Sequence, residues 1–210
     1  MKILNLYSCL GGNRFLWPDT HEITAIENDI ELAKLYKERF KNDNVIVCDA
    51  HNYLLENYQN FDFIWSSPPC PSHSKARFSR KDTTKPIYPD LKLYEEIIFL
   101  KHNFKGKFCI ENVIPYYKPL ISGQKRDRHI YWCNFILPSV LSDRKVLIGC
   151  NKNEFKNLCE FHNINLDNYT GTQRKDKIAR NLVDYKAGLT ILETALNILQ
   201  KTNSIQTQLF

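Results

Sequence analysis

Five short apolar runs, each about the length of a β-strand, constrain the fold of this chain more than any other feature. We interpret as strands the runs 2–12, 21–29, 44–50, 61–67 and 107–113. The first of these leads into a Gly-Gly turn. Apolar residues recur at helical spacing after the second run and again over 91–104. Strands that alternate with helices predict a parallel sheet with right-handed crossovers. The sequence therefore predicts an α/β fold with a doubly wound, mostly parallel sheet.

The first helix is expected to begin directly after the second strand. Asp29 can cap this helix, because its carboxylate can accept hydrogen bonds from backbone N–H groups of the first turn. The apolar stripe of the helix, with the arginine stem as filler, comprises Leu32, Leu35, Tyr36, Arg39 and Phe40.

The alternating pattern changes after Val113. Residues 128–137 are typical of another strand, and 179–200 predicts a terminal amphipathic helix. Residues 150–178 are polar and irregular, which makes them the candidate insertion or subdomain. The last ten residues carry no periodicity.

Composition indicates one globular domain, with 43% hydrophobic and 25% charged residues in a chain of 210. Lys and Arg number 29 against 23 Asp and Glu, which favours a polyanionic partner, although a solvated basic surface fits this charge equally well. The seven cysteines show no CxxC pair and no zinc-ligand spacing, so we expect neither a metal site nor a disulfide framework. Because we find no signal segment and no apolar run of membrane-spanning length, we expect a cytoplasmic protein without a membrane partner.

The apolar run 61–67 ends in a Pro-Pro-Cys turn that presents one thiol, Cys70, beyond the end of a strand. The prolines prevent the strand from continuing, and ligands of open α/β sheets bind beyond the carboxyl ends of strands. A thiolate nucleophile needs positive charge nearby, which His73, Lys75 and Arg77 can supply. Cys70 is therefore a candidate nucleophile, although a cysteine in a proline-rich loop is more often structural.

A second candidate feature is the segment from Asn5 to Gly12, which has the character of a nucleotide-type cofactor loop. Glycines let backbone amides approach a ligand closely, although a Gly-Gly pair after a strand is also an ordinary turn. Glu27, at the end of the next strand, is placed to bind ribose hydroxyls. Asp49 is placed to accept a hydrogen bond from an adenine amino group. Either residue can instead be a helix cap or part of a solvated turn.

A third candidate feature is Glu111 with Asn112, which end the fifth strand and should face the same crevice as Cys70. Burial can keep a carboxylate of this kind protonated, ready to donate a hydrogen bond to a ring nitrogen. The alternative is a glutamate in water at a strand end.

Together these features resemble a known family. The Gly-Gly loop, the Pro-Cys loop and the Glu-Asn-Val strand end have the order and spacing seen in the S-adenosylmethionine-dependent DNA cytosine-5 methyltransferases. The resemblance covers 1–135 and about 173–198, and SSPPCPSHS is similar to the small phage-type members. GQKRDRHIYW resembles the basic motif of the family, with Gln124, Arg126 and Arg128 in place, and ARNLV resembles its closing motif.

The resemblance implies a Rossmann-like methyltransferase fold and methylation of carbon 5 of cytosine, with S-adenosylmethionine as methyl donor and S-adenosylhomocysteine as product. It implies double-stranded DNA as partner, with the target base flipped out of the stack, in a prokaryotic or phage-infected cell and a restriction-modification setting. Cys70 would attack the base, Glu111 would hold its ring nitrogen and amino group, and Arg128 would steady its carbonyl side.

The resemblance also implies binding residues, and no metal ligands. Those expected to bind the cofactor are Tyr7, Ser8, Leu10, Gly11, Gly12, Glu27, Asn28, Asp49, Ala50, Ser67, Pro69, Asn181 and Val183. Those expected to bind nucleic acid are Ser72, His73, Lys75, Arg77, Arg80, Lys81, Arg126 and His129, and Lys85 lies in the same loop.

The resemblance divides the chain into four parts. These are a catalytic and cofactor-binding domain (1–135), a short target-recognition-like segment (136–175), a C-terminal helix that returns to the catalytic domain (176–200) and a tail (201–210). The segment 136–175 and the stretch before Gln124 are shorter than is usual in the family.

Three residues depart from the motifs of the family. Asn5 and Cys9 stand where the family usually has Asp and Gly, and Pro71 replaces the usual Gln. These exchanges put the affinity for the cofactor and the reaction rate in question.

Other functions remain open. The SSPP run is also similar to amino-methyltransferases, but Cys70 stands where those enzymes need an aromatic ring. RNA of the tRNA type is an alternative substrate, because the cytosine chemistry is identical. The short recognition segment favours a further alternative, a non-catalytic subunit or an enzyme that depends on a second polypeptide for target recognition.

Overall fold

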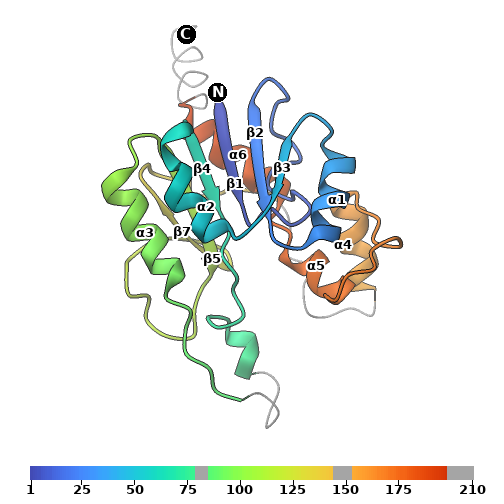
Figure 1. The fold of residues 1–210 in the computed structure, drawn as a ribbon. Helices are drawn as coiled ribbons and strands as arrows, with labels where there is room; N and C mark the ends of the chain where they lie inside the picture. Colours follow the sequence, from blue (N-terminus) through green and yellow to red (C-terminus); the bar gives the residue numbers. More distant parts are fainter. Residues whose placement is uncertain (79–84, 144–152, 198–210) are drawn as a thin grey trace, which may run out of the picture.

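A computed structural model describes residues 1–78, 85–143 and 153–197, and it contains a single twisted sheet between helices (Figure 1). The sheet has seven strands in the order β3-β2-β1-β4-β5-β7-β6. The strands are β1 (Lys2–Leu6), β2 (Glu22–Glu27), β3 (Asn44–Val47), β4 (Phe63–Ser66), β5 (Lys107–Val113), β6 (Gln124–Arg126) and β7 (His129–Cys133). Strands β1 to β5 pair in parallel, whereas β7 pairs antiparallel with both β5 and β6. The predicted α/β fold with a mostly parallel sheet is confirmed.

Helices cover both faces of the sheet (Figure 1). Helices α2 and α3 pack on one face and α6 on the other, while α1 lies against β2 and β3. The helices are α1 (Ile30–Arg39), α2 (Ala50–Asn57), α3 (Lys92–Asn103), α4 (Glu154–His162), α5 (Lys175–Asn181) and α6 (Tyr185–Ala195), with short 3-10 turns η1 (Tyr58–Asn60) and η2 (Lys75–Phe78).

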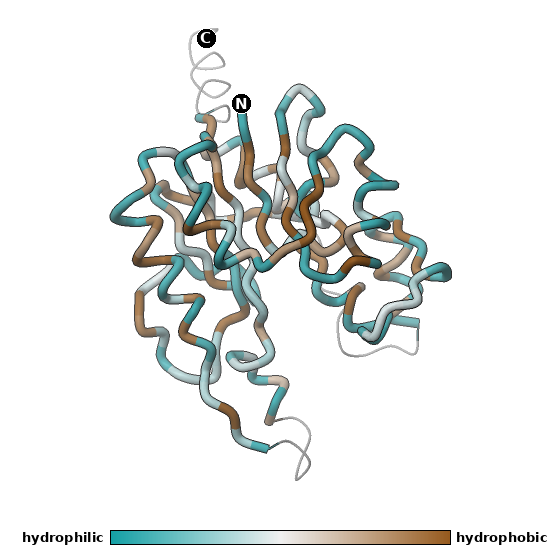
Figure 2. Tube along the Cα trace, in the orientation of Figure 1, coloured by the Kyte–Doolittle hydropathy of each residue, from teal (hydrophilic) through white to brown (hydrophobic). Residues whose placement is uncertain are grey.

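The central strand β4 shows why the apolar runs are continuous rather than alternating. Ile64 faces the layer of α2 and α3, whereas Phe63 and Trp65 face Trp17 and α6. All three side chains are fully buried, because a parallel sheet is covered on both faces. Figure 2 shows the same pattern as hydrophobic stretches along the strands in the middle of the molecule.

The order of the strands reverses between β1 and β4. After β3 the chain passes through α2 and enters β4 on the other side of β1, so the loops that follow β1 and β4 diverge at their carboxyl ends. This switch point is where ligands of doubly wound folds bind. It therefore positions the loop after Leu6 opposite the loop after Ser66.

The elements of the first half largely match the sequence interpretation. Asp29 caps α1 as predicted, because its side chain accepts hydrogen bonds from the backbone N–H groups of Glu31 and Leu32. Helix α2 and strand β6 were not predicted. The expected strand 128–137 is confined to β7.

Two expectations for the second half are wrong. Residues 150–178 are not irregular where the structure describes them, because α4 and most of α5 lie there. The expected single helix 179–200 is broken, since α5 ends at Asn181 with an extended Leu182 and Asp184 caps the start of α6. The tail 201–210 lies outside the described residues.

The expected recognition segment 136–175 packs against the core at two places. Leu137 and Leu141 join the layer of α6, whereas Leu166 and Tyr169 pack with Leu10 beside α1. In the part of the chain that the structure describes, no helix has the length and apolar character needed to cross a membrane.

Candidate active site

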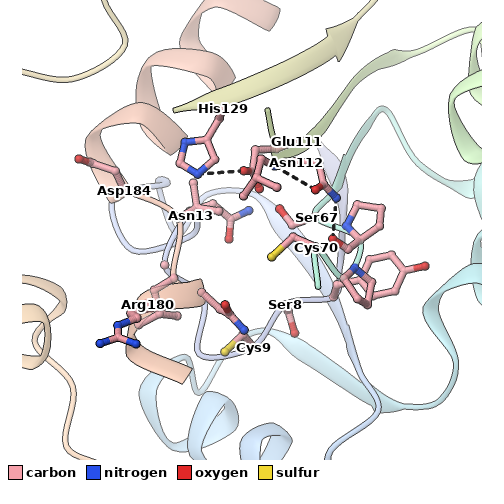
Figure 3. A pocket seen from close by; sticks show the side chains of 18 of the residues that line it. Ser8, Cys9, Asn13, Ser67, Cys70, Glu111, Asn112, His129, Arg180 and Asp184 are labelled. Carbon is pink, nitrogen blue, oxygen red and sulfur yellow. Dashed lines mark hydrogen bonds and ion pairs between the residues drawn. The ribbon is translucent and has the colours of Figure 1, made fainter. Parts of the chain in front are cut away.

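A cavity of about 480 Å³ lies at the switch point, beyond the carboxyl ends of the parallel strands. It is bordered by the loop after β1, the loop after β4, the end of β5, the start of β7 and helix α5. Figure 3 shows the Cys70 sulfur pointing into the space between Glu111 and Cys9. A volume of this size is typical of small-molecule sites.

The loop after β1 is held in an unusual backbone conformation. Tyr7 and Cys9 have φ angles of 55° and 47°, in the left-handed region that non-glycine residues rarely occupy. The backbone N–H of Ser8 donates to Ile26 O at 3.0 Å, and that of Gly11 donates to Ser8 O at 2.8 Å. These bonds curl the loop so that its backbone borders the cavity.

Gly12 is needed because the linker between α5 and α6 presses on the loop. A Cβ atom at Gly12 would lie 2.5 Å from the backbone oxygen of Val183 and 2.9 Å from its nitrogen. The C-terminal part of the chain thus closes the cavity on the side of the loop after β1.

Acidic side chains follow the next two strands. The Glu27 carboxylate accepts hydrogen bonds from the backbone N–H groups of Cys9 at 2.8 Å and Asp29 at 3.0 Å, and it is 7% exposed. Burial raises the pKa of Glu27, and these backbone donors oppose the shift. Asp49 caps α2 through a 2.8 Å bond from Asn52 N and is exposed at the rim. Both residues line the cavity.

The Pro-Pro-Cys loop is anchored from β5. Asn112 donates a 2.9 Å hydrogen bond to the carbonyl of Pro68, and the carbonyl of Cys70 accepts bonds from the backbone N–H groups of His73 and Ser74 at 3.0 Å each. This turn leaves the thiol half-buried at the cavity wall. Burial raises the pKa of the Cys70 thiol, the charge of Glu111 raises it further, and Lys177 opposes both.

Glu111 lies on β5 opposite Tyr131 of β7, with its side chain 9% exposed. The Nε2 atom of His129 lies 3.4 Å from Oε1 of Glu111 (Figure 3). Arg128 also lines the cavity and is exposed, and its backbone oxygen accepts a bond from Ile114 N. The Cys70 thiol, the Glu111 carboxylate and the basic residues at the start of β7 thus border one cavity.

Family comparison matches this geometry. The C-5 cytosine-specific DNA methylases match residues 1–118, a segment that includes the loop after β1, Cys70 and Glu111. The chain belongs to the C-5 cytosine-specific DNA methylase family. Its mostly parallel sheet, with an antiparallel β7, agrees with the α/β fold that the resemblance to this family predicted.

Several solved structures are similar to this chain. A DNMT2 variant of Spodoptera frugiperda shares 25% identity at a TM-score of 0.38, over 53% of this chain and 35% of that one. A hypothetical protein of Thermus thermophilus shares 15% identity at a TM-score of 0.42, over 63% of this chain and 73% of that one. TrmN of the same species shares 16% identity at a TM-score of 0.34, over 53% of this chain and 33% of that one. The chain thus spans about a third of the DNMT2 and TrmN chains. No curated protein sequence matches it.

Most residues predicted to serve the methylase reaction border the cavity. Those that line it are Cys70, Glu111, Arg128, Tyr7, Ser8, Gly12, Glu27, Asn28, Asp49, Ala50, Ser67, Pro69, Asn181, Val183 and His129. Leu10 and Gly11 do not. Leu10 packs into a core cluster with Leu32 and Ile178, and a Cβ atom at Gly11 would meet the ring of Phe40 instead. These two residues shape the loop from behind.

The prediction that His73 supplies charge to Cys70 and binds nucleic acid is wrong. His73 is 1% exposed, its Nδ1 atom lies 2.6 Å from the hydroxyl oxygen of Tyr117, and burial lowers its pKa. Ser72 is also buried, and its hydroxyl accepts a bond from Asp90 N. Both side chains hold the loop to the rest of the protein and are buried.

The remaining basic residues of this prediction have varied positions. Arg126 donates to the carbonyls of Leu137 and Pro138, so its guanidinium fastens the segment after β7 to the sheet. Lys75 is exposed, and Arg77 donates to the carbonyl of Lys85. Arg80 and Lys81 lie outside the described residues.

Helix α5 adds cavity residues that the sequence interpretation missed. Lys177 and Arg180 line the cavity, while Ile178 and Ala179 on the opposite side are buried. Arg180 donates to both carboxylate oxygens of Glu154, at 2.9 and 3.0 Å, which ties α5 to α4. The short apolar pair inside KDKIARN is the signal that could have identified this helix.

Proposed function

We propose that this chain methylates carbon 5 of cytosine in DNA, with S-adenosylmethionine as the methyl donor. One observation carries the proposal: the thiol of Cys70 and the carboxylate of Glu111 border the same cavity as the curled loop after β1. Family membership supports a nucleic-acid substrate, and the formal charge of +6 suits a polyanion.

The residues around the loop fit the cofactor. The hydroxyl of Ser8 is buried at the cavity and has no hydrogen-bond partner among the described residues, so it is available to a ligand. Glu27 and Asp49 would accept hydrogen bonds from hydroxyl and amino groups, and Gly12 keeps the backbone accessible. When bound there, the cofactor supplies a sulfonium whose methyl group is transferred to carbon 5 of the base.

The protein's own groups would activate the base. The thiolate of Cys70 adds to carbon 6, and the electron pair of the 5,6 double bond becomes available at carbon 5. Glu111 would hold ring nitrogen 3 and the amino group of the base, which stabilises the charge that develops there. Loss of the proton from carbon 5 then restores the double bond and expels Cys70 as a thiolate. A cytosine inside a duplex cannot reach this thiol, so the base must be flipped out.

A trapped adduct tests the nucleophile. Duplex DNA that contains 5-fluorocytosine cannot lose a proton from carbon 5, so with S-adenosylmethionine the wild type should form an adduct that survives denaturing electrophoresis. Cys70→Ser should form none. Cys48→Ser, a half-buried thiol outside the cavity, is the matched control and should behave as the wild type. An adduct of undiminished yield in Cys70→Ser would refute the assignment.

The same assay separates the alternatives. A hairpin RNA of matching sequence, trapped in preference to the duplex, would favour an RNA substrate. Methyl transfer that occurs only when a second polypeptide is added would favour partner dependence, as the short 136–175 segment suggests. The four-part division of the chain and the recognition role of that segment remain predictions.

A further inference from the structure

The α3 residue Glu96 is a charged side chain on the apolar face of its helix. Its neighbours on this face, Leu93, Ile97 and Leu100, belong to the hydrophobic core between α3 and the sheet. The Glu96 side chain is 0% exposed. A carboxylate is placed in such surroundings only if several donors satisfy it. Its partners therefore indicate what it does.

Three donors from three different elements meet the Glu96 carboxylate. The hydroxyl of Tyr7 lies 2.6 Å from Oε1, the hydroxyl of Ser66 lies 2.7 Å from Oε2, and Nδ1 of His51 lies 3.2 Å from Oε1. Tyr7 lies in the loop after β1, Ser66 ends β4, and His51 lies in the first turn of α2. Each element leads directly into the cavity wall.

The contacts matter most where the backbone is strained. Tyr7 lines the cavity and occupies the left-handed region, a conformation that a bulky residue keeps only when its surroundings hold it. Ser66 is followed by Ser67 and the Pro-Pro-Cys turn, so the position of Ser66 determines where the loop that carries the Cys70 thiol begins. One carboxylate thus bonds to both sides of the switch point.

We propose that Glu96 is a positioning residue that fixes the loop after β1 and the end of β4 relative to each other, and so holds the cofactor side and the thiol side of the cavity at a constant separation. The inference rests on the proposed function for the identity of the cofactor. The fixing of the two loops by Glu96, called the clamp below, does not depend on that identity. Glu96 itself touches neither cofactor nor base.

The clamp role differs from a purely structural one in what it predicts for variants. Glu96→Gln keeps the shape of the side chain but replaces one acceptor oxygen with an NH₂ donor, which cannot accept from a hydroxyl. If the carboxylate holds the loop, the Km for S-adenosylmethionine should rise about tenfold while kcat at saturating cofactor stays within about twofold. Tyr7→Phe removes the hydrogen bond between Tyr7 and Glu96 from its other end. The double variant Tyr7→Phe/Glu96→Gln should therefore bind S-adenosylhomocysteine no more weakly than Glu96→Gln alone.

The matched control is Glu95→Gln. Glu95 is the preceding residue of α3, is 62% exposed and approaches only the far side of His51, with Oε2 3.3 Å from Nε2. Its removal changes the same charge on the same helix without touching Tyr7 or Ser66. Glu95→Gln should keep the wild-type Km and product affinity.

Hydrogen exchange gives a readout that needs neither cofactor nor activity. Amides of residues 8–12 should exchange at least tenfold faster in Glu96→Gln than in the wild type, while those of α6 keep their protection. S-adenosylhomocysteine binding by calorimetry completes the experiment. Wild type that binds no S-adenosylhomocysteine refutes the proposed function, and the exchange data then still decide the clamp. Unchanged loop exchange in both Glu96→Gln and Tyr7→Phe refutes the clamp, whatever the binding result.

Discussion

The thiol of Cys70 lies between charges of opposite sign. Glu111 on β5 and burial raise its pKa, whereas Lys177 on α5 lowers it. A raised pKa means that the thiol stays protonated at neutral pH and that the thiolate fraction grows as the pH rises toward that pKa. In the free protein Cys70 is therefore expected to be mostly in its thiol form at neutral pH.

This balance predicts opposite effects for two substitutions. Glu111→Gln removes a negative charge, so the pKa of Cys70 should fall and its alkylation by iodoacetamide at about pH 7.5 should speed up about three- to tenfold, where one pKa unit changes the thiolate fraction tenfold. Lys177→Gln should slow alkylation by a similar factor. Mass spectrometry of the Cys70 peptide over a pH series measures both rates.

Methyl transfer provides the control for this prediction. Glu111→Gln replaces one carboxyl oxygen with an NH₂ group, so the side chain no longer holds ring nitrogen 3 and the amino group of the base as the carboxyl does, and methyl transfer should slow by about 100-fold. Slower alkylation in Glu111→Gln, or faster alkylation in Lys177→Gln, would contradict the assigned electrostatics.

Among the elements, α6 makes an unusually close contact with the loop after β1. Gly188, in its first turns, packs on the backbone of Asn13, and the indole N–H of Trp17 donates to Gly188 O at 3.0 Å. Asn13 in turn donates to Asn5 Oδ1 at 2.8 Å on β1. The helix thus supports the loop after β1 from the face opposite α3.

The contact reverses the usual effect of alanine in a helix. Alanine is normally favoured over glycine by about 1 kcal/mol, but a Cβ atom at Gly188 would lie 2.7 Å from Cα of Asn13. Gly188→Ala should therefore lower the free energy of unfolding by about 1–3 kcal/mol, as overpacking does. Urea unfolding measures this, with Glu193→Ala on the same helix as the control. A stabilised Gly188→Ala would mean that the loop yields easily.

At the scale of the whole molecule, net charge and its placement decide how the protein meets a polyanion. The chain carries a formal charge of +6, and the loop between β4 and α3 presents the exposed residues Lys75 and Lys85. In Figure 1 the described parts of this loop, on either side of 79–84, project from the end of the molecule where the parallel strands finish. On the proposed function, we predict that Lys75 and Lys85 contact phosphates of the DNA.

Salt dependence tests these contacts. Removing a single lysine–phosphate interaction should reduce the slope of log affinity against log salt by about 0.9. Lys75→Gln and Lys85→Gln should each show this reduction in DNA-binding titrations at several salt concentrations. Lys34→Gln on α1 is the control, because it makes the same change in net charge away from the loop. The Lys34 ammonium pairs with Glu31 at 2.7 Å. Equal slopes for all three variants would show that only net charge matters.

The sequence by itself determined the parallel strands, the cap of α1 at Asp29 and the meeting of Cys70 with Glu111. Each depends on local patterns, and strands that run parallel bring their carboxyl ends to one edge whatever surrounds them. The order of the motifs along the chain predicted most of the residues that line the cavity, because the motifs follow those strands.

Only the tertiary structure decided which polar side chains face the cavity. His73 and Arg126 look like surface cations in the sequence, yet one is buried against Tyr117 and the other is bound to backbone carbonyls. Lys177 and Glu96 are inconspicuous in the sequence, yet they take up positions beside the thiol and beneath the loop after β1. Burial and pairing depend on partners far along the chain, and periodicity carries no information about those contacts.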